Sequence, residues 1–254
     1  MNSSRFLKYV ILITSLLLIS TICACSNLSS SHKEFSQNIP LAEVVLEAHI
    51  SEPLGDDETL YLEILDEISG LSYNPARFEM QAKDDLNYFI RTPITIGSIV
   101  KYRFVLGGNP PSIEFSSNRE QVRYRILYVT GPRIVRDIIT GWQDQPYYGE
   151  TGEISGYIVN KSNNSAIPDE IVIINGMRTF TAADGSFHIS GIPVGQHNLV
   201  AYHIDGDYQP FQQEAVIAAN ALTPAIFGIE PLKHVNVTFI VTAPNETISG
   251  APIR

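Results

Sequence analysis

Cysteine is scarce in this chain of 254 residues: there are only two, Cys23 and Cys25, and both lie in or beside an N-terminal apolar segment. The rest of the chain can therefore hold no disulfide and no cysteine-ligated metal, and thiol redox chemistry is excluded. Basic residues are also few, 17 Lys and Arg against 27 Asp and Glu, so the net charge is −10. Such acidity disfavours a nucleic acid as partner.

Catalytic signatures are missing too. The sequence contains no Gly-x-Ser-x-Gly elbow, no His-Glu-x-x-His and no phosphate-binding glycine loop. His197 and His203 would lie roughly 20 Å apart on an extended strand, too far to chelate one metal ion. The acidic clusters at 56–58 and 84–85 lack the spacing of a calcium loop. Carboxylates for glycoside hydrolysis can lie far apart in a chain, but no pair stands out. We therefore expect no enzyme activity, no metal and no cofactor.

The N-terminus predicts export. Arg5 and Lys8 precede the apolar stretch 10–19, which is typical of a secretory signal and too short for a spanning helix. The segment Ile22-Cys23-Ala24-Cys25 resembles the bacterial lipobox, in which the final cysteine is lipidated and becomes the new N-terminus. The resemblance implies that acyl chains on Cys25 hold the protein on the extracytoplasmic face of the cell membrane. The alternatives are an ordinary signal peptide with incidental cysteines and an uncleaved anchor helix.

Beyond Pro40 the pattern predicts an all-β protein. Apolar residues recur at every second position or in short β-rich runs, separated by Gly, Pro, Asn and Asp. These runs lie at 44–50, 60–65, 100–104, 122–129, 134–139, 154–159, 171–174, 187–189 and 199–202. Asn175-Gly176 predicts a two-residue hairpin turn, and Asp184-Gly185 predicts another tight turn. Many short strands bury a core by facing two sheets together, so we expect tandem β-sandwich domains, immunoglobulin-like or prealbumin-like.

The second half carries a specific combination of short motifs, which lie at 152–158, 166–168, 171–173, 179–187, 192–195 and 199–201. Together they resemble the carboxypeptidase regulatory-like domain, a transthyretin-type sandwich that is an accessory module in exported proteins. Physical reasoning agrees with the resemblance, because Gly156 permits a close backbone approach and Phe187 supplies a core side chain. The resemblance implies a spacer or interaction domain that carries out no chemistry.

The first half carries a shorter signal. The strand Val100–Phe104, then Glu114 and Asn118-Arg119, resembles the family 20 starch-binding module and related glycogen-binding sandwiches. The resemblance makes Glu114 a candidate carbohydrate contact. However, Ile113 stands where that family has a glycan-stacking tryptophan, and a branched aliphatic side chain has no flat face for a sugar ring.

Three other aromatic residues are candidate carbohydrate contacts: Trp142, Tyr147 and Tyr148. Trp142 is the only tryptophan and follows the last strand of the first half, where covering a sandwich edge is the more frequent role. The two tyrosines lie in the expected linker, where aromatic residues more often pack between domains.

Charged residues on neighbouring strands form another cluster. Alternate strand residues share a face, so the members of this cluster could line a charged pocket. We favour the simpler interpretation, which is cross-strand charge pairs on the solvent face without a ligand. The cluster consists of Arg103, Arg123, Arg125, Arg133 and Arg136 with Glu114 and Asp137.

The chain also resembles itself. When Pro40-Leu41 is aligned with Pro231-Leu232, apolar positions stay in phase without a gap. We interpret this as a repeat, in which a third sandwich begins at Pro231 without the strands it needs to bury its face. The predicted organisation is a signal peptide at 1–24, a tether at 25–39, a starch-binding-like sandwich at 40–144, a linker at 145–151, a regulatory-like sandwich at 152–230 and a truncated third sandwich at 231–254.

These observations support one functional hypothesis and one alternative. The hypothesis is a non-catalytic bacterial surface lipoprotein whose partners are the membrane, through the lipid anchor, and a polysaccharide or another envelope component. In the alternative, the modules are the leading part of a larger secreted hydrolase, a glycoside hydrolase or a peptidase, whose catalytic domain follows Arg254. The open reading frame beyond that codon would discriminate between them.

Overall fold

The computed structural model describes residues 39–65, 75–108, 110–143 and 146–233, and two short strands beyond them. Cys25, the signal and nearly all of the tether lie outside the described residues, and so does most of 231–254. The predictions for these segments stay predictions. The described residues all belong to one compact unit, Ile39–Arg254. Within this described part, no helix is long and apolar enough to cross a membrane.

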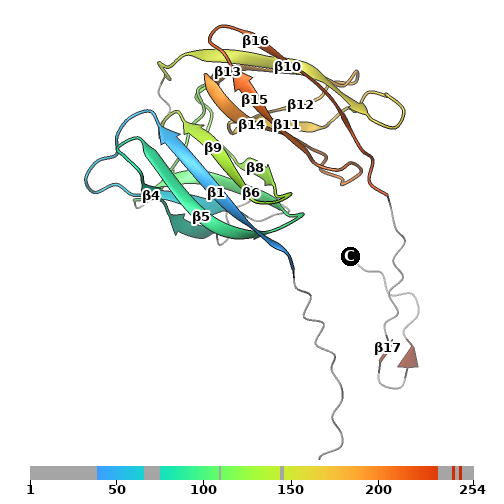
Figure 1. The fold of residues 1–254 in the computed structure, drawn as a ribbon, viewed down its shortest axis with the longest axis horizontal. Helices are drawn as coiled ribbons and strands as arrows, with labels where there is room; N and C mark the ends of the chain where they lie inside the picture. Colours follow the sequence, from blue (N-terminus) through green and yellow to red (C-terminus); the bar gives the residue numbers. More distant parts are fainter. Residues whose placement is uncertain are drawn as a thin grey trace, which may run out of the picture. The chain divides into compact units, whose positions relative to one another are not determined.

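The described residues form strands in facing sheets, which confirms the predicted all-β tandem sandwich class (Figure 1). In the first sandwich, one sheet has the order β4-β5-β1-β9, and the other has β3-β2-β6-β7 with β8 also paired to β6. Its strands are β1 (Leu41–Ile50), β2 (Leu60–Ile64), β3 (Ala76–Glu79), β4 (Gln81–Ala82), β5 (Asn87–Thr95), β6 (Ile99–Leu106), β7 (Ser112–Ile113), β8 (Arg125–Tyr128) and β9 (Arg133–Ile139).

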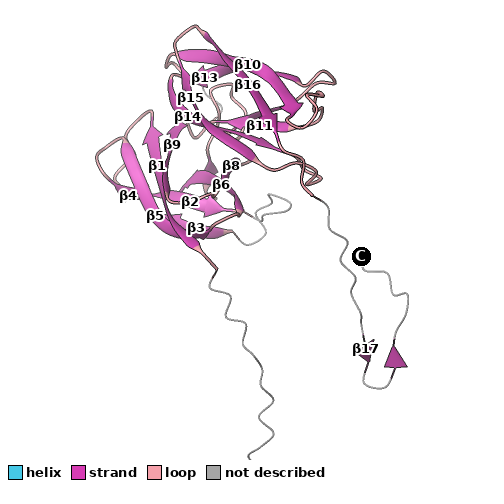
Figure 2. Ribbon diagram, turned by 45° about the vertical axis from the view of Figure 1, so that its right-hand side comes forward, coloured by secondary structure: helices cyan, strands magenta, loops and turns pink. Residues whose placement is uncertain are grey.

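In the second sandwich, the sheet β13-β10-β16 faces the sheet β12-β11-β14-β15 (Figure 2). Its strands are β10 (Thr151–Asn160), β11 (Ile171–Ile174), β12 (Met177–Phe180), β13 (Ser186–Pro193), β14 (Gly195–Tyr202), β15 (Phe211–Ile217) and β16 (Leu222–Ile229). Within 231–254, the structure describes residues 231–233 and the antiparallel pair β17 (Thr242–Ala243) and β18 (Glu246–Thr247).

The alternation that predicted β1 is the feature that builds the first core. Val44, Leu46, Ala48 and Ile50 are buried in one apolar cluster with Tyr102 and Phe104 of β6. Strand β1 pairs antiparallel with β5 and parallel with β9. The parallel pairing matters for the site below, because the carboxyl ends of β1 and β9 leave the sheet at the same edge.

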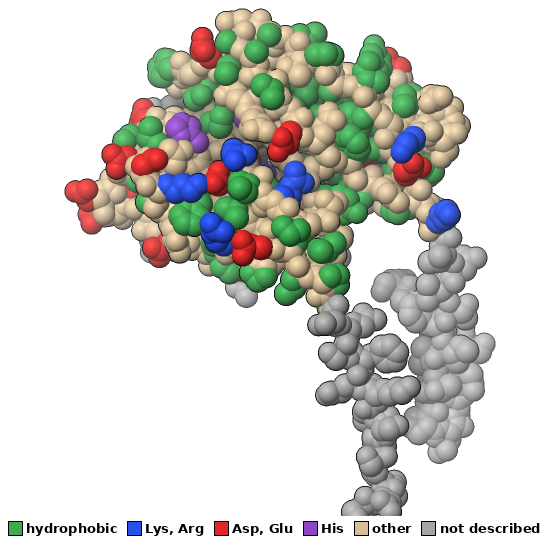
Figure 3. Space-filling view, viewed as in Figure 1, with side chains coloured by type: hydrophobic (Ala, Val, Ile, Leu, Met, Phe, Trp, Pro, Cys, Tyr) green, Lys and Arg blue, Asp and Glu red, His purple; other side chains and the backbone are tan. Residues whose placement is uncertain are grey.

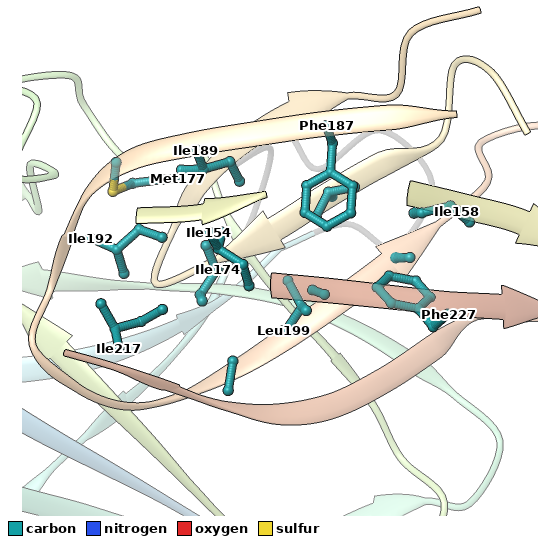
Figure 4. Packing of buried hydrophobic residues seen from close by; sticks show 14 of the residues in the cluster. Ile154, Ile158, Ile174, Met177, Phe187, Ile189, Ile192, Leu199, Ile217 and Phe227 are labelled. Carbon is teal, nitrogen blue, oxygen red and sulfur yellow. The ribbon is translucent and has the colours of Figure 1, made fainter. Parts of the chain in front are cut away.

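The second core contains the residues that the turn and motif analysis placed there. Phe187 is buried in it, with Ile154 and Ile158 of β10 (Figure 4). Asn175 and Gly176 both have positive φ, 47° and 76°, as a type I′ turn between β11 and β12 requires. Gly156 allows β10 to approach β16: a Cβ there would lie 1.5 Å from the carbonyl oxygen of Ala225.

A third apolar cluster joins the two sandwiches. Tyr124 and Ile126 of the first sandwich pack with Ile171, Ile173 and Val200 of the second, and Leu65 completes the cluster. Along β11 the side chains therefore alternate between this cluster and the second core, and all four residues of the strand are buried. Burial on both faces explains why the sequence of β11 is a continuous apolar run.

One predicted strand is much shorter than expected. The run 122–129 predicts a long strand, but β8 spans only Arg125–Tyr128. The preceding residues leave the ladder because the backbone N–H of Val122 donates to the carbonyl of Glu114, and Tyr124 turns into the cluster between the sandwiches.

Candidate functional site

A hollow with aromatic walls lies at the edge where β1 and β9 end. In the parallel register, His49 lies opposite Ile138 and Ile50 opposite Ile139, so the segments that follow both strands emerge side by side. The hydroxyl of Ser51 donates to the carbonyl of Ile139 at 3.1 Å and fixes one of these segments. The hollow has a volume of about 550 Å³ and is lined by residues of 49–54, Glu58, 140–143 and 146–149.

The hollow brings together Trp142, Tyr147 and Tyr148, the three aromatic residues singled out in the sequence. Trp142 is half-buried and packs against the first core, so it covers the sandwich edge as expected and still lines the hollow. Tyr148 is 92% exposed. Tyr147 is half-buried, and burial raises the pKa of its phenol. One wall of the hollow is thus the Trp142 ring, which packs on the core, and another is the exposed ring of Tyr148.

The backbone next to Trp142 is hydrogen-bonded to Phe115, which follows β7. The N–H of Phe115 donates to the carbonyl of Gly141 at 2.9 Å, and the hydroxyl of Thr140 donates to the carbonyl of Phe115 at 2.7 Å. The remaining wall is polar and includes the exposed carboxylates Glu52 and Glu58. An open hollow that combines aromatic faces with a few polar groups is suited to binding a ligand without chemical conversion.

Glu114, the fourth predicted contact residue, lies elsewhere. Its side chain is fully buried and binds the guanidinium of Arg125 through two hydrogen bonds, Nε to Oε1 at 3.1 Å and Nη2 to Oε2 at 2.6 Å. Oε1 also accepts the backbone N–H of Phe104 at 3.0 Å. Its carboxylate oxygens are directed to groups inside the protein, so we leave Glu114 out of the carbohydrate site.

Arg125 also joins the two sandwiches. Its Nη1 donates to Asp137 Oδ1 and to Asn175 Oδ1, both at 2.9 Å, and Asn175 lies in the β11–β12 turn of the second sandwich. Tyr102 donates its hydroxyl to Asp137 Oδ2 at 2.8 Å. Burial by itself would lower the pKa of Arg125, but the carboxylates of Glu114 and Asp137 more than offset it and raise the pKa. Burial beside Asp137 raises the pKa of Tyr102 well above its usual value.

The solvent-face interpretation of the charged cluster is therefore wrong for Arg125, Glu114 and Asp137. They are 3%, 0% and 6% exposed and form a buried network. Sequence alone could not show this, because β8 contacts the second sandwich and the face that would be solvated in one isolated sandwich is covered.

The prediction of cross-strand charge pairs on the solvent face is confirmed for Arg136. Its side chain is half exposed and pairs with Glu47 at 3.3 Å across the strands β9 and β1. Lys83 also pairs with Glu47, and Arg91 pairs with Glu43 at 3.2 Å. Figure 3 shows side chains of both signs interspersed on the face over β1, β5 and β9.

No group of three or more metal-binding side chains occurs among the described residues. His197 is buried, and its Nε2 donates to the carbonyl of Pro193 at 2.7 Å, which assigns it a structural role. Desolvation lowers the pKa of His197. The ring of His203 packs on Tyr208, with the ring centroids 5.3 Å apart.

Comparison with known proteins does not assign the chain to a family. No family model and no curated protein matches it. Among solved structures, it is similar to the Bacillus anthracis TIE protein, with 11% sequence identity over 76% of this chain and 34% of that chain and a TM-score of 0.29. It is also similar to GBS52, a minor pilin of Streptococcus agalactiae, with 10% identity over 78% of this chain and 99% of that chain and a TM-score of 0.29. A third similar structure is the shaft pilin SpaA of Lactobacillus rhamnosus GG, with 9% identity over 78% of this chain and 100% of that chain and a TM-score of 0.27. The chain thus spans about a third of the TIE protein, and likeness at this level identifies neither family nor activity.

Proposed function

We propose that this chain is a non-catalytic surface protein whose β-sandwich modules act as spacers and whose hollow beside Trp142 binds a neutral glycan. The observation that carries the proposal is that Trp142, Tyr147 and Tyr148 line the same open hollow. Aromatic rings offer apolar faces to the C–H groups of a sugar ring, while nearby polar side chains can bind its hydroxyls. Glu52 and Glu58 line the same wall and disfavour an acidic glycan.

The proposal includes the predicted organisation of the chain. Residues 40–144 and 152–230 are the two modules, and 25–39 tethers them to a lipid-modified Cys25. The separate apolar cores of the two sandwiches support this division, and the cluster between them supports a role as a stiff spacer. The resemblances to starch-binding and carboxypeptidase regulatory-like domains stay predictions.

Glycan binding is tested by retention of the soluble chain, without its signal segment, on starch, cellulose and peptidoglycan. We expect retention on at least one polymer. Tyr148→Ala should weaken it about three- to tenfold, because it removes an exposed ring worth about 1 kcal/mol of contact. Tyr157→Ala is the matched control, since Tyr157 is a half-exposed tyrosine on β10 outside the hollow. Lack of retention on every polymer, or equal weakening by both variants, would refute the glycan site.

Lipidation is tested separately with the full-length chain. Cys25→Ala should release the protein from the membrane fraction, because thioether attachment of the lipid requires a thiol at this position. Cys23→Ala is the control and should leave the protein in the membrane fraction. Membrane retention of the Cys25→Ala variant would contradict the lipoprotein prediction without affecting the glycan site.

A further inference from the structure

A second hollow, of about 300 Å³, lies where the segment 116–123 of the first sandwich meets β12 and β13 of the second. Its lining is mainly polar and includes Ser116, Asn118, Thr179 and Ser190. It is separate from the hollow beside Trp142, since the two share no lining residue.

Two arginines from different sandwiches converge on this hollow. The Cζ atoms of Arg123 and Arg178 lie 5.8 Å and 5.7 Å from the centroid of the same ring, that of Tyr124. Both side chains are exposed, and neither forms an ion pair with any residue that the structure describes. In a chain of net charge −10, two exposed guanidinium groups beside one ring are thus left without a carboxylate partner among the described residues.

Other charged groups around the hollow leave it cationic. Glu120 is the one carboxylate among its lining residues, against Arg123 and Arg178. His188 also lines it, and its Nε2 lies 2.8 Å from the carboxylate of Glu153.

The walls are held in place before any ligand arrives. Asn118 Nδ2 donates to the carbonyl of Ser190 at 3.2 Å, and the hydroxyl of Ser117 donates to the carbonyl of Gly191. Gly191 has a φ of 76°, and a Cβ there would lie 2.3 Å from Asn118 Oδ1, so the contact depends on glycine. Rigid walls reduce the entropy that binding must overcome.

We propose that this hollow binds the oxyanion of an acidic saccharide, either the carboxylate of a uronic acid or the phosphate of a sugar phosphate. Each guanidinium lies over the Tyr124 ring without an ion-pair partner among the described residues, so its N–H groups can form bidentate hydrogen bonds to an oxyanion. The surrounding hydroxyl and amide groups match the hydroxyls of a sugar. The proposal does not rest on the neutral-glycan site.

The test is calorimetric titration of the soluble chain at low ionic strength with trigalacturonate, glucose 6-phosphate and neutral maltotriose. We expect trigalacturonate, glucose 6-phosphate or both to bind here, with affinity falling as salt is added. The preferred acidic ligand identifies carboxylate or phosphate as the source of the oxyanion. Arg123→Gln and Arg178→Gln should each weaken binding about tenfold, as loss of a charged hydrogen-bond donor predicts.

Arg91→Gln is the matched control, because Arg91 is an exposed arginine on β5 that does not line this hollow. This variant should leave the affinity for the acidic ligand unchanged. The proposal is overturned if neither acidic ligand binds, or if the double variant of Arg123 and Arg178 binds as well as the unchanged chain. Equal weakening by Arg91→Gln would also overturn it, since it would show attraction by net charge alone.

Discussion

At the residue scale, the buried ionisable side chains differ in how many of their polar atoms have a hydrogen-bond partner. Arg125 has a carboxylate or amide oxygen opposite each of its nitrogen atoms. Glu170 is equally buried, yet neither carboxylate oxygen has a hydrogen-bond partner among the described residues. The first arrangement requires charge, whereas the second favours a neutral, protonated side chain.

Arg125→Met should therefore be strongly destabilising. The substitution keeps an unbranched side chain but leaves Glu114 and Asp137 buried without a counter-charge, which costs about 3–5 kcal/mol in comparable pairs. Urea denaturation measures the loss. Arg136→Met is the control, because its ion pair with Glu47 is half exposed and should contribute less than about 1 kcal/mol. Similar losses in the two variants would contradict the assigned role of the buried network.

Glu170 predicts a specific dependence of stability on pH. Desolvation raises its pKa from 4.5 to about 8. The folded state holds the proton of the Glu170 carboxyl more tightly than the unfolded state does. The contribution of Glu170 to the free energy of unfolding is therefore complete below about pH 4.5 and is lost as the pH rises toward 8, by up to about 1.4 kcal/mol per pH unit.

Glu170→Gln should remove this slope and make the protein more stable than the unchanged chain at pH 8. Thermal unfolding of both proteins between pH 5 and pH 9 provides the measurement. If their difference in unfolding free energy stays constant over this range, Glu170 does not titrate as its burial requires.

At the element scale, β10 is the central strand of its sheet and packs closely against β16 because one of its residues lacks a side chain. Gly156 lies opposite Ala225 in the parallel register with β16 and opposite Phe187 in the antiparallel register with β13. A methyl group at this position would overlap the backbone of β16. Strand separation cannot relax locally, because β10 forms hydrogen bonds with both neighbours.

Gly156→Ala should cost several kcal/mol or prevent folding of the second sandwich, as overpacking against backbone does. Gly131→Ala is the control, since a Cβ there meets no atom within 4 Å. It should change the unfolding free energy by less than about 0.5 kcal/mol. Circular dichroism and chemical denaturation measure both effects, and a stable Gly156→Ala variant would show that the two strands can separate.

At the scale of the whole molecule, the contacts between the sandwiches resemble a small core. The apolar cluster around Tyr124 and Ile173 is flanked by hydrogen bonds: Gln212 exchanges two with the backbone of Tyr128, both at 3.0 Å, and Asn198 donates to the carbonyl of Ile126 at 3.3 Å. Such contacts couple the stabilities of the two sandwiches.

We therefore expect the two sandwiches to unfold in one calorimetric transition. Ile173→Thr keeps a β-branched residue in β11 but places a hydroxyl in the shared cluster, and should split the transition in two. The matched control is Ile226→Thr on β16, where the side chain is 73% exposed. Two transitions in the unchanged chain would contradict the coupling.

Much of this architecture follows from sequence pattern, because local physics determines it. The alternating burial in β1 and the positive φ of Asn175 and Gly176 can be predicted from neighbouring residues alone. The same reasoning named Trp142, Tyr147 and Tyr148 as candidate contacts. It did not reveal that they share one hollow, since that depends on the parallel pairing of β1 and β9, whose residues are distant in the chain.

Strand content, the tight turns and the close approach at Gly156 can be predicted from the sequence, because they depend on side-chain size and backbone conformation within a few residues. The burial of Glu114 and the contact of Arg123 and Arg178 with one tyrosine arise only in the folded chain. Burial and charge pairing depend on where the two sandwiches meet, and no local pattern records which outer face another sheet will cover.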